Sequence, residues 1–348
     1  MSRLPAEVEK QIATVILFPS RDDVWRESCT PIRKMMVALA NAIVPYERVV
    51  MGVLPELTDV VKEYPLDPRV EILEVKYNDC WSRDTVSSVL LNDDGTKSLA
   101  SFGFNSYGAG LYEPWDDDEA IDKTVSAFFG YGLNPSPLIL EGGNIAPDGN
   151  GTIFAVRESI VNDNRNPGLS TEEVEALLKE ATAAKQIVWI EKGLPEDETG
   201  GHIDNVLFFV DKNTLLLSWT DDEKSAHYAR VREIERTIKA ARNADGEPYS
   251  IIHIPVPDLY YRTADDSDTI VEADGSFERK AGDAVLQTYI NFAIANGVVV
   301  VPQFGLPTDR EAIEVVKRAF PDRAIVPFDA KEASLGGGGL HCLTKHIH

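Results

Sequence analysis

Short apolar segments alternate with helical patterns along most of this chain, and this alternation limits the folds open to it. The stretch from Ser170 shows the helical kind, because Glu173 follows a Ser at the N-cap position and apolar residues then recur at helical spacing. Strands that alternate with helices indicate an α/β architecture. We expect strands at 13–19, 48–53, 70–75, 137–143, 186–193, 250–257, 297–305 and 324–330. We expect helices at 31–42, 116–128, 170–183, 224–241, 283–295 and 310–320.

Several of the expected strands end directly in residues that can do chemistry. The segments are "VKYNDCWSRD", "LILEGGN" and "IEKGLPEDETGGHID", each about fifty to seventy residues after the last. This spacing indicates repeats of one strand-rich unit, each of which contributes a group to a shared centre.

The segment "GGGGLHCLT" (336–344) runs four glycines straight into a His-Cys pair. Ordering glycine is costly, so a folded protein keeps such a run where backbone passes very close to something or adopts positive φ. The residue at the far end is Cys342, a strong nucleophile once it is a thiolate. The run therefore predicts a catalytic cysteine presented by a tight loop.

A thiol of ordinary pKa is mostly protonated at pH 7, so a cysteine nucleophile needs a base or a positive neighbour. His202 is the best candidate of the six histidines, because Gly200 and Gly201 precede it and Asp204 follows. In a strand, positions 202 and 204 point to the same face. Imidazole and carboxylate would then enter one pocket together.

Three carboxylates stand at strand ends next to glycines or in the same short segments: Asp84, Glu141 and Asp204. A cysteine protease needs only one group to orient its histidine. Additional buried carboxylates indicate a bound cation. Paired carboxylates bind a planar guanidinium well, because they can form bidentate hydrogen bonds with it. The residues alone therefore point to a thiol enzyme that acts on a guanidine or amidine.

Each residue taken singly also has a structural interpretation. His202 could serve packing, Glu141 could lie in a solvated turn, and Asp84 could form a surface ion pair with Arg83. The glycine run lacks the Lys-Ser/Thr ending of a phosphate-binding loop. It is the combination that favours catalysis.

The C-terminal histidines His341, His346 and His348 could be taken for a metal cluster. No nearby residue completes a ligand set with sensible spacing. We expect no metal site.

Charge and cysteine content limit the partners and the compartment. The formal net charge of −23 argues against nucleic acid and against anionic membrane surfaces. The three cysteines are an odd and sparse set, which fits a reducing cytosol. The apolar run at 16–18 is too short and too closely flanked by charges for a signal peptide. We expect a soluble, cytoplasmic protein.

The chain resembles the agmatine deiminases of the guanidine-modifying, pentein-fold superfamily, which also contains peptidylarginine deiminases. The resemblance runs nearly end to end. Its motifs are "RDDVWRE" (21–27), "NDCWSRDT" (78–85), "GFNSYGAGLYEPWDDD" (103–118), "LEGGNIAPDGNGT" (140–152), "RNPGLSTEE" (165–173), "DETGGHIDNVLFFV" (197–210), "LSWTDD" (217–222), "YINFAIANGVVVVPQFG" (289–305) and "GGGGLHCLT". It implies a five-bladed α/β propeller of pseudo-symmetric ββαβ units, formed by a single domain over 1–348.

The resemblance also implies roles. Cys342 attacks the guanidinium carbon, while Asp84 and Asp204 hold the guanidinium nitrogens. His202, oriented by Glu141, protonates the departing ammonia and later activates water. Agmatine would yield N-carbamoylputrescine through a thiouronium intermediate, with no metal or organic cofactor.

This chain departs from the family pattern at a few positions. Val86 and Ser87 stand where Gly-Pro is common, and Lys345 and His346 stand where Gln-Gln often follows. These departures could reshape the far end of the pocket, where an amine would bind.

Trp81, Trp115 and Asp79 lie in matched motifs and are candidates to line that far end. An aromatic wall and a carboxylate are what an ammonium group favours.

Two alternatives stay open. The enzyme could deiminate another guanidine, such as arginine or peptidyl-arginine, or the chain could be a silent guanidine- or polyamine-binding protein. The sequence leaves the oligomeric state open, a homo-oligomer included. We expect the tail at 345–348 to be disordered.

Overall fold

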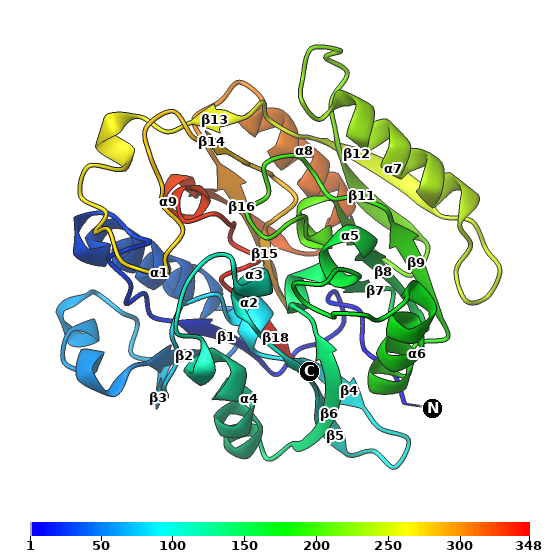
Figure 1. The fold of residues 1–348 in the computed structure, drawn as a ribbon, viewed down its shortest axis with the longest axis horizontal. Coiled ribbons are helices and arrows are strands. Elements are labelled where there is room, and N and C mark those ends of the chain that lie inside the picture. The colour runs from blue at the N-terminus through cyan, green and yellow to red at the C-terminus, as the bar shows by residue number, and fades with distance from the viewer. Residues whose placement is uncertain (1) are drawn as a thin grey trace.

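The computed structural model describes residues 2–348. Five small sheets repeat one pattern, in which an antiparallel strand pair is followed by a helix and then by a strand parallel to the second. We call each of these units a blade. Figure 1 shows the five sheets in a ring around the centre, with the long helices toward the outside. The ββαβ units predicted above are present.

The elements of the blades follow in chain order around the ring. Blade 1 holds β18 (Lys345–Ile347), β1 (Ala13–Leu17), α1 (Thr30–Ile43), β2 (Val49–Val53) and β3 (Glu71–Glu74). Blade 2 holds β4 (Ser88–Leu91), β5 (Lys97–Gly103), α4 (Asp116–Phe129) and β6 (Gly132–Ile139). Blade 3 holds β7 (Ile145–Pro147), β8 (Thr152–Val156), α6 (Thr171–Thr182) and β9 (Gln186–Ile190). Blade 4 holds β10 (Leu207–Phe209), β11 (Thr214–Trp219), α7 (Tyr228–Ala240) and β12 (Ser250–Pro255). Blade 5 holds β15 (Ala293–Ala295), β16 (Val298–Gln303), α8 (Asp309–Ala319) and β17 (Ala324–Asp329).

Shorter elements connect the blades. The short helices are α2 (Ser82–Thr85), α3 (Ser106–Ala109), α5 (Arg157–Ile160) and α9 (Lys331–Leu335). The 3₁₀ turns are η1 (Glu27–Cys29), η2 (Pro55–Leu57), η3 (Val61–Glu63), η4 (Gly142–Asn144), η5 (Ile203–Asn205) and η6 (Ala264–Asp266). A two-stranded ribbon pairs β13 (Tyr260–Tyr261) with β14 (Ala284–Val285).

Local sequence explains the helices that were predicted. Ser170 caps α6 by accepting from the backbone N–H of Glu173, and the Glu173 carboxylate accepts from the backbone N–H of Ser170. Four acidic residues in the first turn of α4 complement the positive end of its dipole, and Gly130 ends that helix at φ 72°. The helices predicted at 31–42, 116–128, 170–183, 224–241 and 310–320 are confirmed as α1, α4, α6, α7 and α8.

The helix predicted at 283–295 is wrong, because this segment holds β14, a turn and β15. Phe292 and Ile294 pack into one core cluster, whereas Ala293 and Ala295 pack into another. Apolar residues therefore face both sides of the strand, and the sequence shows no alternation that would distinguish it from a buried helix.

The C-terminal tail is also not as predicted. Residues 345–347 form β18, which pairs antiparallel with β1 in the register Ala13↔Ile347 and Val15↔Lys345. The last strand of the chain thus completes the sheet that β1 begins, and the C-terminal end lies near the middle of Figure 1.

The inner strands carry the core. Every position of β1, β2 and β8 is buried, as expected for strands covered on both faces. Within residues 2–348, no helix is long and apolar enough to cross a bilayer.

We expect Ile347→Ala to lower the free energy of unfolding by about 2–5 kcal/mol, because the side chain is fully buried in blade 1. Ile72→Ala on β3 is the matched control, since its side chain is 43% exposed and its loss should cost about 0.5 kcal/mol or less. Urea unfolding measures both. Equal effects of the two substitutions would mean that the tail does not complete blade 1.

Candidate active site

The connections between successive blades meet at the centre of the ring. Asp84 lies on α2 between blades 1 and 2, and Glu141 comes just before η4 between blades 2 and 3. His202 precedes η5 and Asp204 lies on it, between blades 3 and 4. Cys342 lies between α9 and β18, where blade 5 leads back into blade 1. The structure brings together all five predicted residues, although His202 and Asp204 occupy a 3₁₀ turn and its N-cap rather than the expected strand.

Gly143 shows how closely these side chains converge. A Cβ atom at this position would lie 2.7 Å from His202 Nδ1, 2.8 Å from Asp84 Oδ1 and 3.1 Å from Asp204 Oδ2. Its N–H donates to Asp84 Oδ1 at 2.8 Å. Glycine is therefore required here, because any side chain would occupy the space between the three groups.

Glu141 is fully buried between two cationic partners. Its Oε1 accepts from Arg165 Nε at 2.7 Å, and its Oε2 lies 3.7 Å from His202 Nε2. Burial opposes ionisation of Glu141, but Arg165 and His202 outweigh it and lower its pKa to about 2.

His202 lies between two carboxylates, because its Nδ1 is 3.7 Å from Asp84 Oδ1. Burial would lower the pKa of His202, but Asp84 and Glu141 raise it to about 9. The imidazole is therefore protonated near neutral pH. The other oxygen of Asp84, Oδ2, accepts from the Tyr107 hydroxyl at 3.0 Å.

The thiol of Cys342 contacts an amide and a carboxylate. Asn291 Nδ2 lies 3.2 Å from the sulfur, and Asp204 Oδ2 lies 3.5 Å from it. Burial and the negative charges of Asp204 and Asp84 raise the pKa of Cys342 well above that of an ordinary thiol. The cysteine is therefore protonated near neutral pH in this structure.

The glycine run before Cys342 is packed against side chains. A Cβ atom would lie 1.9 Å from Trp25 at Gly336, 2.5 Å from Trp81 at Gly338 and 2.3 Å from Asn291 Oδ1 at Gly339. Only Gly337 has positive φ, at 99°. Close approach of the backbone, more than unusual dihedral angles, explains the run.

A pocket opens above the sulfur. Its lining residues are Trp81, Asp84, Tyr107, Leu111, Glu198, Thr199, Gly336, Gly337, Gly338 and Cys342. Glu198 carries the second carboxylate of this lining, and its Oε2 accepts from Arg279 at 2.6 Å while Oε1 lies 3.6 Å from Arg262.

The three residues expected at the far end of the pocket have different positions. Trp81 lines the pocket and donates from Nε1 to Asp79 Oδ2 at 3.1 Å. Asp79 is 1% exposed and does not belong to the lining. Trp115 is half-buried against the cluster of Phe104, Tyr107 and Tyr112. Among the described residues, only Trp81 of these three contributes to the pocket wall.

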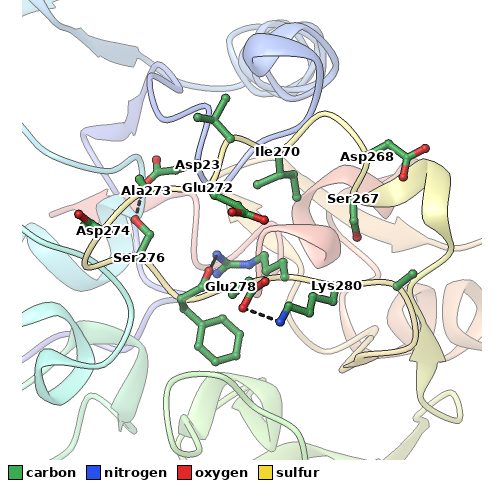
Figure 2. Close-up of a pocket in the computed structure, with 14 residues that line it drawn as sticks. Asp23, Ser267, Asp268, Ile270, Glu272, Ala273, Asp274, Ser276, Glu278 and Lys280 are labelled. Carbon is green, nitrogen blue, oxygen red and sulfur yellow. Dashed lines mark hydrogen bonds and ion pairs between the residues drawn. The ribbon is translucent and has the colours of Figure 1, made fainter.

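A larger cavity of about 640 Å³ is lined by Asp23 and by side chains of the segment 267–281, which Figure 2 shows. This segment is part of the connection between β13 and β14. Arg279 lines the cavity and donates to Glu198 and, at 3.2 Å, to the carbonyl of Gly336. Its guanidinium thus joins the large cavity to the wall of the pocket that contains Cys342.

Two of the C-terminal histidines, His341 and His346, lie close to the carboxylate of Glu7, which the sequence did not indicate. One ligand atom each of Glu7, His341 and His346 lie within 4.8 Å of one another. Arg83 donates to Glu7 at 2.8 Å and lies 3.3 Å from His346 Nδ1. A fixed guanidinium against two of three ligands repels a metal cation, so these residues do not fit one.

Sequence reasoning missed several residues of the site. Arg165, Asn291, Tyr107 and Glu198 were not singled out, although each lies in or within two residues of a motif quoted for the resemblance. Their signal was their position in these motifs, because nothing in the local pattern connects them to Cys342.

Comparisons with known proteins agree on the fold and on the family. The chain matches the family described as Porphyromonas-type peptidyl-arginine deiminase over residues 3–347. Agmatine deiminase of Pseudomonas putida is 35% identical over 346 residues, which cover 98% of this chain and 94% of that protein. A structure of agmatine deiminase of Enterococcus faecalis matches with a TM-score of 0.95 at 29% identity, covering 99% of this chain and 95% of that one. A DDAH structure from Pseudomonas aeruginosa shares the fold, with a TM-score of 0.53 at 14% identity over 97% of this chain and 100% of that one. The predicted pentein fold is confirmed.

We expect a pH dependence of stability that comes from His202. Its folded pKa of about 9 lies above its ordinary value of 6.5, so the stabilisation is complete below about pH 6.5 and is lost as the pH rises through about 9. His202→Gln should remove this loss, and the difference in unfolding free energy between the two proteins should therefore change between pH 6 and pH 9.5.

Urea unfolding over that range measures the difference. His253→Gln is the control, because His253 lies on the exposed side of β12, where its ion pair with Glu235 contributes little to stability. It should keep the wild-type slope. If the difference in unfolding free energy between the wild-type protein and His202→Gln stays constant with pH, the ion pairing of His202 is contradicted.

Proposed function

This chain belongs to the Porphyromonas-type peptidyl-arginine deiminase family, and we propose that it is a hydrolase that converts agmatine and water to N-carbamoylputrescine and ammonia. The proposal draws its support from the buried groups around Cys342 and from the curated relatives named above.

One observation carries the proposal most directly. Among the described residues, Asp204 Oδ1 is buried without a hydrogen-bond partner, while Glu141 Oε2 and both ring nitrogens of His202 make no hydrogen bond and have only the 3.7 Å ion pairs described above. Buried polar atoms without partners are costly, and such atoms in one site point to a polar ligand. The carboxylate oxygens accept only, so the ligand must donate, and a guanidinium presents five N–H donors in one plane.

In the proposed reaction, Asp84 and Asp204 hold the guanidinium nitrogens and place its carbon near Cys342 Sγ. The bound cation offsets the negative charges that disfavour the thiolate, so the thiol loses its proton to solvent as the substrate binds. The thiolate then attacks the guanidinium carbon and forms a tetrahedral adduct. Positioning and charge complementarity thus act together at the first step.

His202 supplies the acid and the base of the following steps. As an imidazolium it protonates one nitrogen of the adduct, so that ammonia leaves and a thiouronium remains on the sulfur. The neutral imidazole then takes a proton from water, and the resulting hydroxide attacks the thiouronium carbon. Expulsion of the thiolate leaves the ureido product protonated, and loss of its hydroxyl proton to the thiolate releases the neutral ureido group and restores the Cys342 thiol. Glu141 keeps the imidazole oriented between these steps.

We propose that Glu198, a carboxylate in the pocket wall, receives the amine end of the substrate. Glu198 lines this pocket, whereas Arg279 and Arg262 both engage Glu198 and, in the described chain, neither is part of the lining. The primary ammonium of agmatine would share the Glu198 carboxylate with them, beside the indole face of Trp81. Arg279 and Arg262 already pair with Glu198, so the charge at this position does not exclude the α-carboxylate of arginine, and arginine or peptidyl-arginine is the second candidate.

We expect ammonia release from agmatine, and little from arginine or a blocked peptidyl-arginine. Cys342→Ser should lower kcat for agmatine by at least about a thousandfold, because it removes the nucleophile. Cys29→Ser is the control, since Cys29 is a buried cysteine that does not line the pocket. Turnover of arginine alone would replace agmatine by the alternative, and binding of agmatine without any turnover would favour a silent binding protein.

We expect Glu198→Gln to raise KM for agmatine about tenfold to a hundredfold, with a smaller effect on kcat, because a charge-assisted contact to the ammonium is lost. Butylguanidine lacks that ammonium, and its KM should not respond to the substitution. Glu196→Gln on the exposed part of the same loop is the matched control. Equal effects on the two substrates would remove Glu198 from amine recognition.

A further inference from the structure

A chain of close contacts leads from the N-terminal segment to the catalytic sulfur. Glu7 Oε2 lies 2.6 Å from His341 Nε2, and His341 Nδ1 lies 2.9 Å from Asp204 Oδ2. The same oxygen of Asp204 lies 3.5 Å from Cys342 Sγ. Glu7 is separated from His341 by 334 positions in sequence, so this contact is made by the closed ring and not by local structure.

Donor counting fixes the charge of His341. A carboxylate oxygen only accepts, and both ring nitrogens of His341 face one. With both carboxyl groups ionised, the two contacts are both hydrogen bonds only if both nitrogens carry protons, which makes His341 an imidazolium. Glu7 is held as an anion by Arg83, whose Nη1 donates to Glu7 Oε1 at 2.8 Å.

The charged groups around His341 are those just named together with His346, whose ring lies 5.8 Å from the His341 ring centroid. Burial and Arg83 act to lower the pKa of His341, but Glu7 and Asp204 outweigh them and raise it. Burial and Arg83 lower the pKa of His346 well below its ordinary value, so this neighbour is neutral. Burial opposes ionisation of Glu7, but Arg83 and His341 outweigh it and lower its pKa well below the ordinary value.

The two oxygens of the Asp204 carboxylate have different contacts. Oδ2 contacts both His341 and Cys342, whereas Oδ1 has no hydrogen-bond partner in the protein. An imidazolium bound to Oδ2 fixes the rotation of the carboxylate and leaves Oδ1 for a guanidinium nitrogen.

We propose that Glu7 and His341 are positioning residues, which together hold the Asp204 carboxylate in the orientation that receives the guanidinium. The proposal rests on the function proposed above. Glu7 keeps His341 protonated, and the protonated ring donates a hydrogen bond to Asp204 Oδ2. Neither Glu7 nor His341 contacts the substrate.

A double-mutant cycle tests whether the two residues act as one unit. We expect Glu7→Gln and His341→Asn each to lower kcat/KM for agmatine by about tenfold to a hundredfold, and the double variant to lose no more than the larger single loss. Glu9→Gln is the matched control, since Glu9 lies on the same segment and pairs with Arg3 on the outside. It should change kcat/KM by about twofold or less. Additive losses, or a Glu7→Gln enzyme as active as Glu9→Gln, would overturn the proposal.

A second measurement needs neither substrate nor a variant that might fail to fold. In the ¹⁵N-labelled wild-type protein, both ring nitrogens of His341 should carry protons at pH 7, and the ring should lose its proton at a higher pH than an ordinary imidazole does. A neutral His341 at pH 7 would overturn the proposal whatever the kinetics show. If His341 is doubly protonated while agmatine is not hydrolysed, the contact chain stands and the proposed substrate fails.

Discussion

Three carboxylates are buried at the centre of the ring, and the cost of burying them constrains the residues around them. Asp84, Glu141 and Asp204 are each no more than 6% exposed. A buried charge is tolerated only when it is paired and hydrogen-bonded. Arg165 and His202 stabilise Glu141, while His341 contacts Asp204. Because His341 lies in the connection from blade 5 back into blade 1, the ring must close before the charge of Asp204 is paired.

The packing of the glycine run also depends on residues that are distant in sequence. The indoles of Trp25 and Trp81 lie 5.5 Å apart, and each presses against a glycine of the run. The aromatic pair thus supports the backbone that presents Cys342. Rigid support below a nucleophile preserves its position relative to Asp84 and Asp204, which the proposed chemistry requires.

The sequence contains enough local information for most helices and for the residues next to glycines. Ser170 and Glu173 mark a cap, and Glu141 is followed directly by a pair of glycines, so these features could be predicted. The resemblance added the propeller and the roles of the site residues, and those roles remain proposals. Asn291 and Glu7 escaped prediction, because they reach the cysteine region only through contacts across 51 and 334 positions.

The pairing of β18 with β1 has a consequence for the assembly of the protein. Ribosomal synthesis produces β1 early, whereas its antiparallel partner comes more than three hundred residues later in the chain. Until then one edge of β1 exposes backbone donors and acceptors that another chain can pair with. Contacts between residues so far apart in sequence also form slowly. Where nascent chains are crowded, misassembly is therefore expected at the free edge of β1. This is the edge that later pairs with β18 and so holds the cysteine loop in place.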